Sequence, residues 1–100
     1  MTRPSATETV QVDDERFRVT EWRFSPGAET GWHTHELPYV VVPQTTGTLT
    51  VETSEAEPFA MDCIAGVSYS RAPGAHHNIV NDRDEAFTFV EIEAKPAPVA

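Results

Sequence analysis

Cysteine is almost absent from this chain, since Cys63 is the single one among 100 residues. A lone cysteine excludes an internal disulfide, and nothing else in the sequence indicates an oxidising compartment. Long apolar runs are missing too, because no stretch approaches the roughly 18 consecutive apolar residues of a transmembrane helix. Residues 1–5 lack the apolar region of a signal peptide. We therefore expect a soluble, cytoplasmic protein.

Basic residues are also few. The chain has 7 lysines and arginines against 16 aspartates and glutamates, which gives a formal net charge of -9. That charge repels phosphate backbones and anionic lipid surfaces, so neither nucleic acid nor membrane is expected as a partner. The acidic residues are spread from Glu8 to Glu93 and form no interaction tail, so solubility is the simplest role of the charge.

Helical periodicity is absent as well, and the dominant period of the sequence is two. Residues 48–52 alternate cleanly, and so does the stretch around Phe87 and Phe89. In residues 17–24 the alternation changes phase, which predicts a bulge near Glu21 or a strand buried on both faces. Turn signals such as Ser25-Pro26-Gly27 separate these runs. Several short strands with this spacing predict an all-β sandwich or barrel.

The length permits one domain and leaves no room for a second core. Residues 1–6 are polar and contain Pro4, and residues 95–100 contain two prolines, which lack the amide donors needed for regular pairing. We therefore expect a flexible N-terminal arm over residues 1–6, a single domain over residues 7–94, and a flexible C-terminal tail over residues 95–100.

Three histidines form a candidate metal site. His33 and His35 flank one residue, so on a strand their side chains project from the same side. Imidazole nitrogens bind zinc, iron, nickel or copper, and three neutral imidazoles with an open position form a known catalytic metal shell. We expect His77 to be the third ligand, provided that the fold brings it beside His33. The neighbouring His76 should point to solvent or lie at the mouth of the barrel.

These histidines and their flanking glycines resemble the two motifs of the cupin superfamily. The first motif, G-x5-H-x-H followed later by a glycine, is matched by Gly27, His33, His35 and Gly47. The second, G-x5-P-x-G-x2-H-x3-N, is matched by Gly66, Gly74, His77 and Asn81, with Pro73 one place later than usual and Ala72 in its slot. The resemblance implies a small single-domain cupin of the cupin-2-like type. Such a protein is a double-stranded β-helix (jelly-roll) barrel, and the resemblance implies that His33, His35 and His77 hold an iron, zinc, nickel or manganese ion inside it.

The glutamate of the first motif is missing here. Its position is occupied by Tyr39 or Val40, depending on whether the gap after His35 is three or four residues. Parity from His35 favours an inward Tyr39, whereas counting back from Gly47 favours Val40. An inward Tyr39 could donate a hydrogen bond from its phenol to a bound substrate or water, which makes it the candidate catalytic residue. Packing in the core is an equally good interpretation.

Other residues are weaker candidates for the site. Glu91 shares its parity with Phe87 and Phe89, so it either adds a carboxylate to the barrel or faces solvent, and the latter is the simpler interpretation. Tyr69 and Arg71 could reach a bound anion, although a surface role is simpler. Trp32 is expected between the sheets or in a dimer interface. Cys63 is expected to be a small buried hydrophobe, without the basic neighbours of an activated thiolate.

The function predicted from these residues is that of a small metal-binding protein, an enzyme acting on a small anionic or oxygenated organic molecule. A neutral three-histidine shell leaves the ion its full charge, which favours anionic ligands. The alternative is a non-catalytic module that binds or senses a small ligand, so the sequence leaves open whether this protein is an enzyme. Apolar strands around Trp22 and residues 40–42 predict a homodimer.

Overall fold

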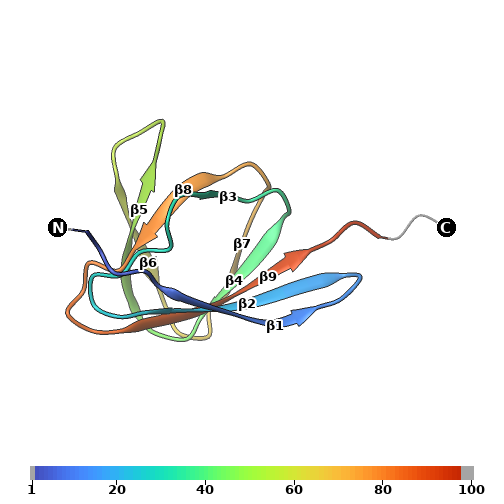
Figure 1. Cartoon of the computed structure of the whole chain (residues 1–100), viewed down its shortest axis with the longest axis horizontal. Helices are drawn as coiled ribbons and strands as arrows, with labels where there is room; N and C mark the ends of the chain where they lie inside the picture. Colours follow the sequence, from blue (N-terminus) through green and yellow to red (C-terminus); the bar gives the residue numbers. More distant parts are fainter. Residues whose placement is uncertain (1, 98–100) are drawn as a thin grey trace.

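Nine β-strands in two sheets make up the structure, a computed structural model that describes residues 2–97 (Figure 1). The strands are β1 (Thr7–Asp13), β2 (Phe17–Phe24), β3 (His33–Thr34), β4 (Tyr39–Pro43), β5 (Gly47–Thr53), β6 (Phe59–Cys63), β7 (Tyr69–Arg71), β8 (His76–Val80) and β9 (Phe87–Ala94). One sheet has the order β1-β2-β9-β4-β7 and the other the order β3-β8-β5-β6. The described residues include no helix that could cross a membrane. The predicted all-β, jelly-roll class is confirmed.

The core lies between the two sheets and follows the period of two. Along β4 and β9 every second side chain is buried and the ones between are half-buried. Tyr39, Val41, Phe87 and Phe89 therefore face the interior. The half-buried residues between them lie on the outer face of the five-stranded sheet. Across the interior, β5 and β8 contribute the opposite wall, with Leu49, Val51 and Ile79.

The predicted bulge near Glu21 is wrong. β2 pairs with β9 without interruption from Phe17 to Phe24, and the irregularity lies instead in β1, between Val10 and Val12. Phe24 is 1% exposed and Phe17 is 45% exposed. Phe17 thus belongs to the outer face of an unbroken strand. The phase change arose because both faces of β2 carry apolar residues, and alternation alone cannot distinguish that case from a bulge.

The segments outside the strands make some contacts with the body. The Ala6 amide donates to the Glu29 carbonyl at 2.7 Å, and the Glu29 amide donates to the Pro4 carbonyl at 2.9 Å. At the other end, the Lys95 amide donates to the Arg16 carbonyl at 2.7 Å. The strands run from Thr7 to Ala94, and the flexibility of the arms over residues 1–6 and 95–100 stays a prediction. Met1 and residues 98–100 lie outside the described part of the chain.

Candidate metal centre

The three histidines meet because β3 pairs with β8. In this antiparallel pair His33 lies opposite His77. The register continues beyond β3, since the His35 amide donates to the Ala75 carbonyl at 2.9 Å and the Gly74 amide donates to the His35 carbonyl at 2.8 Å. Gly74 has a φ of 106°, a left-handed conformation that favours glycine and turns the chain into β8. The pairing of these two strands thus brings together histidines that lie more than forty residues apart in the sequence.

Two of the three pairs of ligand nitrogens have the spacing that one metal ion requires. The Nε2 atom of His33 lies 3.1 Å from Nε2 of His35 and 3.2 Å from Nε2 of His77. Two nitrogens bound to one ion at about 2.1 Å, with an angle of 90 to 110° between them, lie about 3.0 to 3.4 Å apart. The rings meet edge to face, at interplanar angles of 81°, 75° and 80°. All three ligand nitrogens lie within 4.8 Å of one another, so this group could hold one divalent ion with further positions left open.

The protonation of the rings also suits metal binding. Nδ1 of His33 lies 2.8 Å from the Gly31 carbonyl oxygen, so this nitrogen carries the proton and donates it. The lone pair is then left on Nε2, which points into the cluster. Burial, reinforced by the neighbouring histidines, lowers the pKa of His35 and of His77 to about 4. Both rings are therefore neutral at pH 7, the form that binds a metal.

Glu91 on β9 supplies a carboxylate beside the cluster, so the interpretation that it faces solvent is wrong. Glu91 is 7% exposed, and its Oε2 lies 3.5 Å from Nε2 of His35. Trp22 Nε1 donates to its Oε1 at 2.9 Å. Burial raises the pKa of Glu91 to about 7, against the opposing effect of the Trp22 hydrogen bond. Because the pKa of His35 is lowered, the His35 contact is not an ion pair at neutral pH.

Tyr39, not Val40, takes the inward position after the first histidine pair. Tyr39 is 4% exposed, and its ring stacks on the His35 ring with centroids 3.9 Å apart. Val40 alternates to the outer face of the sheet. Burial raises the pKa of Tyr39 to about 12, so the phenol keeps its proton at neutral pH. Parity from His35 gave the correct orientation, while the catalytic role of Tyr39 stays a prediction.

The remaining candidates lie mostly as expected. His76 is exposed, and its Nδ1 lies 2.7 Å from Oγ1 of Thr34. Cys63 is buried, as the sequence predicts. Trp32 is 51% exposed and packs against the His76 ring, with centroids 5.5 Å apart. Trp32 therefore does not lie between the sheets, and its place in a dimer interface stays a prediction.

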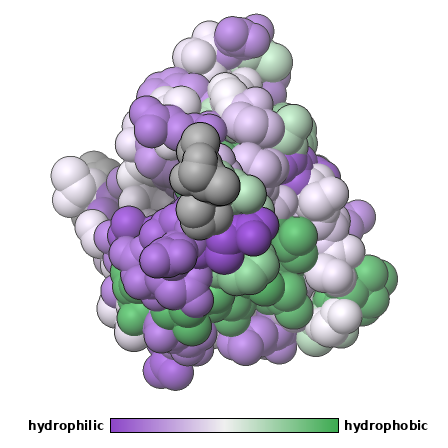
Figure 2. Space-filling view, turned by 90° about the vertical axis from the view of Figure 1, so that its right-hand side faces the viewer, coloured by the Kyte–Doolittle hydropathy of each residue, from purple (hydrophilic) through white to green (hydrophobic). Residues whose placement is uncertain are grey.

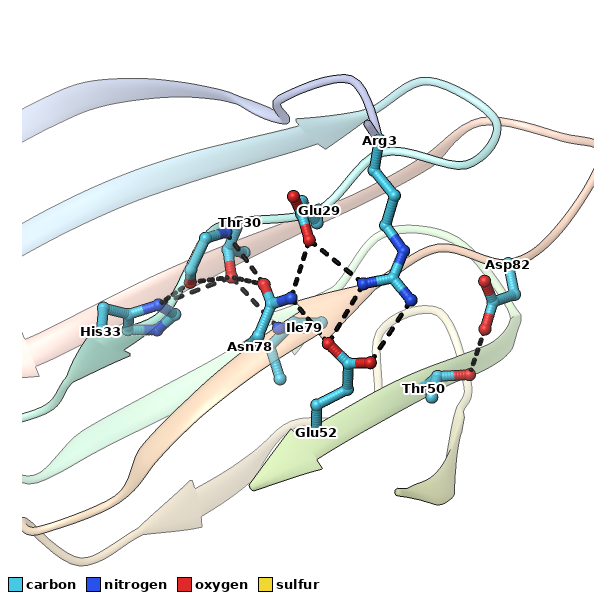
Figure 3. Close-up of polar contacts among 10 residues, drawn as sticks. Arg3, Glu29, Thr30, His33, Thr50, Glu52, Asn78, Ile79 and Asp82 are labelled. Carbon is cyan, nitrogen blue, oxygen red and sulfur yellow. Dashed lines mark hydrogen bonds and ion pairs between the residues drawn. The ribbon is translucent and has the colours of Figure 1, made fainter. Parts of the chain in front are cut away.

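A polar network holds the loop that orients His33 (Figure 3). Asn78 is 1% exposed, and its Oδ1 accepts a hydrogen bond from the Gly31 amide at 2.9 Å. Its Nδ2 donates to carboxylate oxygens of Glu29 and Glu52, each at 2.8 Å. The same two carboxylates meet the Arg3 guanidinium. Sequence reasoning missed Asn78, since the only signal was its place directly after His77.

We expect Asn78→Ala to weaken metal binding by about 10- to 100-fold, the usual cost of losing a partner that orients a ligand. Without the amide, the Gly31 carbonyl is no longer held where it accepts the proton of His33 Nδ1. The measurement is zinc affinity in competition with a chromophoric chelator. Thr50→Ala is the matched control, because it removes an exposed hydrogen bond to Asp82 and should leave the affinity unchanged. Equal affinities in the two variants would contradict this role.

The metal-free protein should lose stability as the pH falls from about 6.5 to 4. Over that range the unfolded chain takes up protons on His35 and His77, while the folded chain does not until the pH reaches about 4. Glu91 acts in the opposite direction, because its raised pKa lets the folded chain bind a proton first. The effect of the two imidazoles on the free energy of unfolding exceeds the opposite effect of the one carboxyl group, so the folded state is destabilised as the pH falls. Thermal unfolding in the presence of a chelator should show a Tm that falls as the pH falls over this range. In the His77→Gln variant the Tm should depend less steeply on pH.

Two cavities adjoin the cluster. The apolar cavity, of about 200 Å³, is lined by His77, Glu91, Arg71 and mostly apolar side chains. The polar cavity, of about 290 Å³, is lined by His33, His35 and Glu91 together with Arg18 and other polar residues. Glu91 lines both cavities, and each cavity has at least one of the three histidines in its lining. A small molecule in either cavity would therefore lie beside this carboxylate and part of the cluster.

Comparison with known proteins identifies the family. No family model matches the chain. The chain is 52% identical over 93 residues to the beta-alanine degradation protein BauB of Pseudomonas aeruginosa. The aligned region covers 93% of this chain and 97% of that protein. A crystal structure of a cupin domain from Bordetella pertussis is 55% identical, with a TM-score of 0.93 over 96% of this chain and 99% of that one.

More distant structures share the fold alone. The polyketide cyclase RemF of Streptomyces resistomycificus is 20% identical, with a TM-score of 0.69 over 99% of this chain and 73% of that one. The two close relatives, in contrast, match over nearly their whole lengths. Together with the jelly-roll fold and the converging histidines, these matches show that the chain belongs to the cupin family.

Proposed function

We propose that this cupin is a metal-dependent enzyme that acts on a small aliphatic carboxylate. The observation that carries the proposal is the convergence of the Nε2 atoms of His33, His35 and His77 at 3.1 and 3.2 Å. The name of the relative BauB refers to the degradation of beta-alanine. Because beta-alanine is a small aliphatic carboxylate, that name supports the same substrate class for this chain.

The proposed ion is iron, zinc, nickel or manganese, held by the three neutral imidazoles. Such an ion acts as a Lewis acid that polarises an oxygen-bearing group of the substrate. Glu91 provides a carboxylate oxygen that can accept a proton from the substrate, and its orientation is held by Trp22. Tyr39 provides a protonated phenol next to His35. The cavity beside His77 presents mostly apolar side chains to the carbon chain of a substrate.

Turnover by defined metal-loaded samples tests this function. We expect protein loaded with one of the four metals to consume at least one member of a panel of three- and four-carbon carboxylates, or to consume oxygen in its presence. His35→Ala should abolish that activity. If the loaded protein binds members of the panel but converts none, the alternative function, a non-catalytic binding or sensing module, is the correct one.

We also propose that two copies of the chain pair through the outer face of the five-stranded sheet. This face carries half-buried valines and isoleucine from three strands: Val19, Val40, Val42, Val90 and Ile92. Figure 2 shows a hydrophobic band across the lower half of one end of the molecule, the side on which this sheet lies in Figure 1. A second copy related by a two-fold axis would present the same apolar surface to it.

The solution mass tests the pairing. Light scattering should give about twice the chain mass of 11.1 kDa. Val90→Lys places a charge in the middle of the proposed interface and should shift the mass toward that of one chain. Val67→Lys is the control, because Val67 is 57% exposed outside this face. A wild-type mass near 11.1 kDa would contradict the dimer.

A further inference from the structure

We infer that Arg71 binds the carboxylate of the substrate in the apolar cavity, while the rest of the molecule reaches toward the three-histidine centre. This inference rests on the proposed function for its reaction, and it adds the recognition site for the acid group. The substrate that this site predicts is a short aliphatic acid with a second oxygen or nitrogen at the end opposite its carboxylate.

The cavity itself selects for such a molecule. Its volume of about 200 Å³ is below the range of roughly 300 to 1,000 Å³ that is usual for drug-sized ligands. Six of its lining residues are fully apolar: Val41, Val51, Phe59, Met61, Ile79 and Phe89. These side chains offer no partner for a charge, so a carboxylate buried among them would be costly. Charged or coordinating groups of a ligand therefore belong beside the polar lining residues.

Arg71 supplies the positively charged side chain among the residues that line this cavity. On β7 it lies opposite Tyr39 of β4, so both side chains project from the same face of the sheet. The ring of Tyr39 stacks in turn on His35. Arg71 is therefore one cross-strand neighbour away from a side chain that touches the cluster. His77 and Glu91 line the same cavity.

The guanidinium of Arg71 is held but not neutralised. It lies over the Tyr69 ring, 4.5 Å from the centroid, and its Nη1 donates to the Ser70 carbonyl at 2.9 Å. Within residues 2–97 no carboxylate lies within 4.0 Å of it, whereas Arg3, Arg23 and Arg83 each pair with a glutamate. Arg16 and Arg18 also lack such a partner within these residues, but of the three only Arg71 lines this cavity. Its remaining N–H groups suit a carboxylate, which a planar guanidinium binds through two parallel hydrogen bonds.

Calorimetric titration of the zinc-loaded protein with 3-hydroxypropionate and with its uncharged amide tests the inference. The wild type should bind the acid at least ten-fold more tightly than the amide. Arg71→Gln should weaken binding of the acid by about 10- to 100-fold and leave binding of the amide unchanged. Arg71→Lys should recover part of the loss. Arg16→Gln removes an exposed arginine of the β1–β2 turn and should have no effect.

The zinc content of each sample separates this inference from the proposed function. If the wild type holds no zinc, the proposed function is contradicted, and the same titration of the metal-free protein decides the role of Arg71. A preference for the acid that disappears in Arg71→Gln supports the inference in either sample. It is overturned if neither compound binds the wild type, if acid and amide bind equally, or if Arg71→Gln keeps the preference.

Discussion

Replacing His77 by alanine is expected to leave less than about a tenth of an equivalent of bound metal, where the wild type holds about one. The three Nε2 atoms lie 3.1 and 3.2 Å apart around His33, so the ion depends on all three imidazoles. Without His77 only the two ligands His33 and His35 remain, whereas catalytic zinc sites have three protein ligands. Elemental analysis of protein purified without added metal measures the difference.

His76→Ala is the matched control for this experiment. His76 precedes His77 on the same strand but is exposed, and its ring nitrogen contacts Thr34. It should therefore retain the wild-type metal content. Circular dichroism of both variants checks that the fold persists. A wild type with less than about a tenth of an equivalent, or a His77→Ala variant that keeps its metal, would refute the three-histidine centre.

Glu91→Gln is expected to lower turnover by about 10²-fold or more while the metal stays bound. In the proposed site the three histidines would hold the ion, so an amide in place of the carboxylate would leave the ligand set intact. The amide still accepts the hydrogen bond that Trp22 donates to Oε1, but it can no longer take a proton from the substrate. Loss of a positioned acid or base typically costs 10² to 10⁴ in rate. The measurement is kcat on whichever carboxylate the wild type consumes, together with metal content.

Glu85→Gln is the control, because the Glu85 side chain is 80% exposed and pairs with Arg83 outside the site. It should keep wild-type turnover. Full activity in Glu91→Gln would contradict the proposed role of this carboxylate. Loss of the metal from Glu91→Gln would instead assign Glu91 as a ligand.

Much of the fold and part of the site could be predicted from strand parity. The alternation in the residues of β5 and β9 predicted strands, and parity from His35 placed Tyr39 in the interior. The same argument could not place Glu91, because β9 carries apolar residues on both faces, with Phe87 and Phe89 on one and Val90 on the other. Which face is covered depends on the strands of the opposite sheet. For the same reason the sequence left open a bulge near Glu21 or a strand buried on both faces, and the structure shows β2 without a bulge against β9.

By itself the sequence determined the three-histidine set, the motif glycines and the all-β class, because each follows from local spacing and from the geometry of an extended chain. Only the tertiary structure decided which groups surround those histidines. The pairing of β3 with β8 brings His77 to His33, β9 brings a carboxylate to a site whose motif lacks one, and β7 brings an unpaired Arg71 to the same cavity. Strand pairing joins residues far apart in the chain, and its register depends on the packing of the whole core.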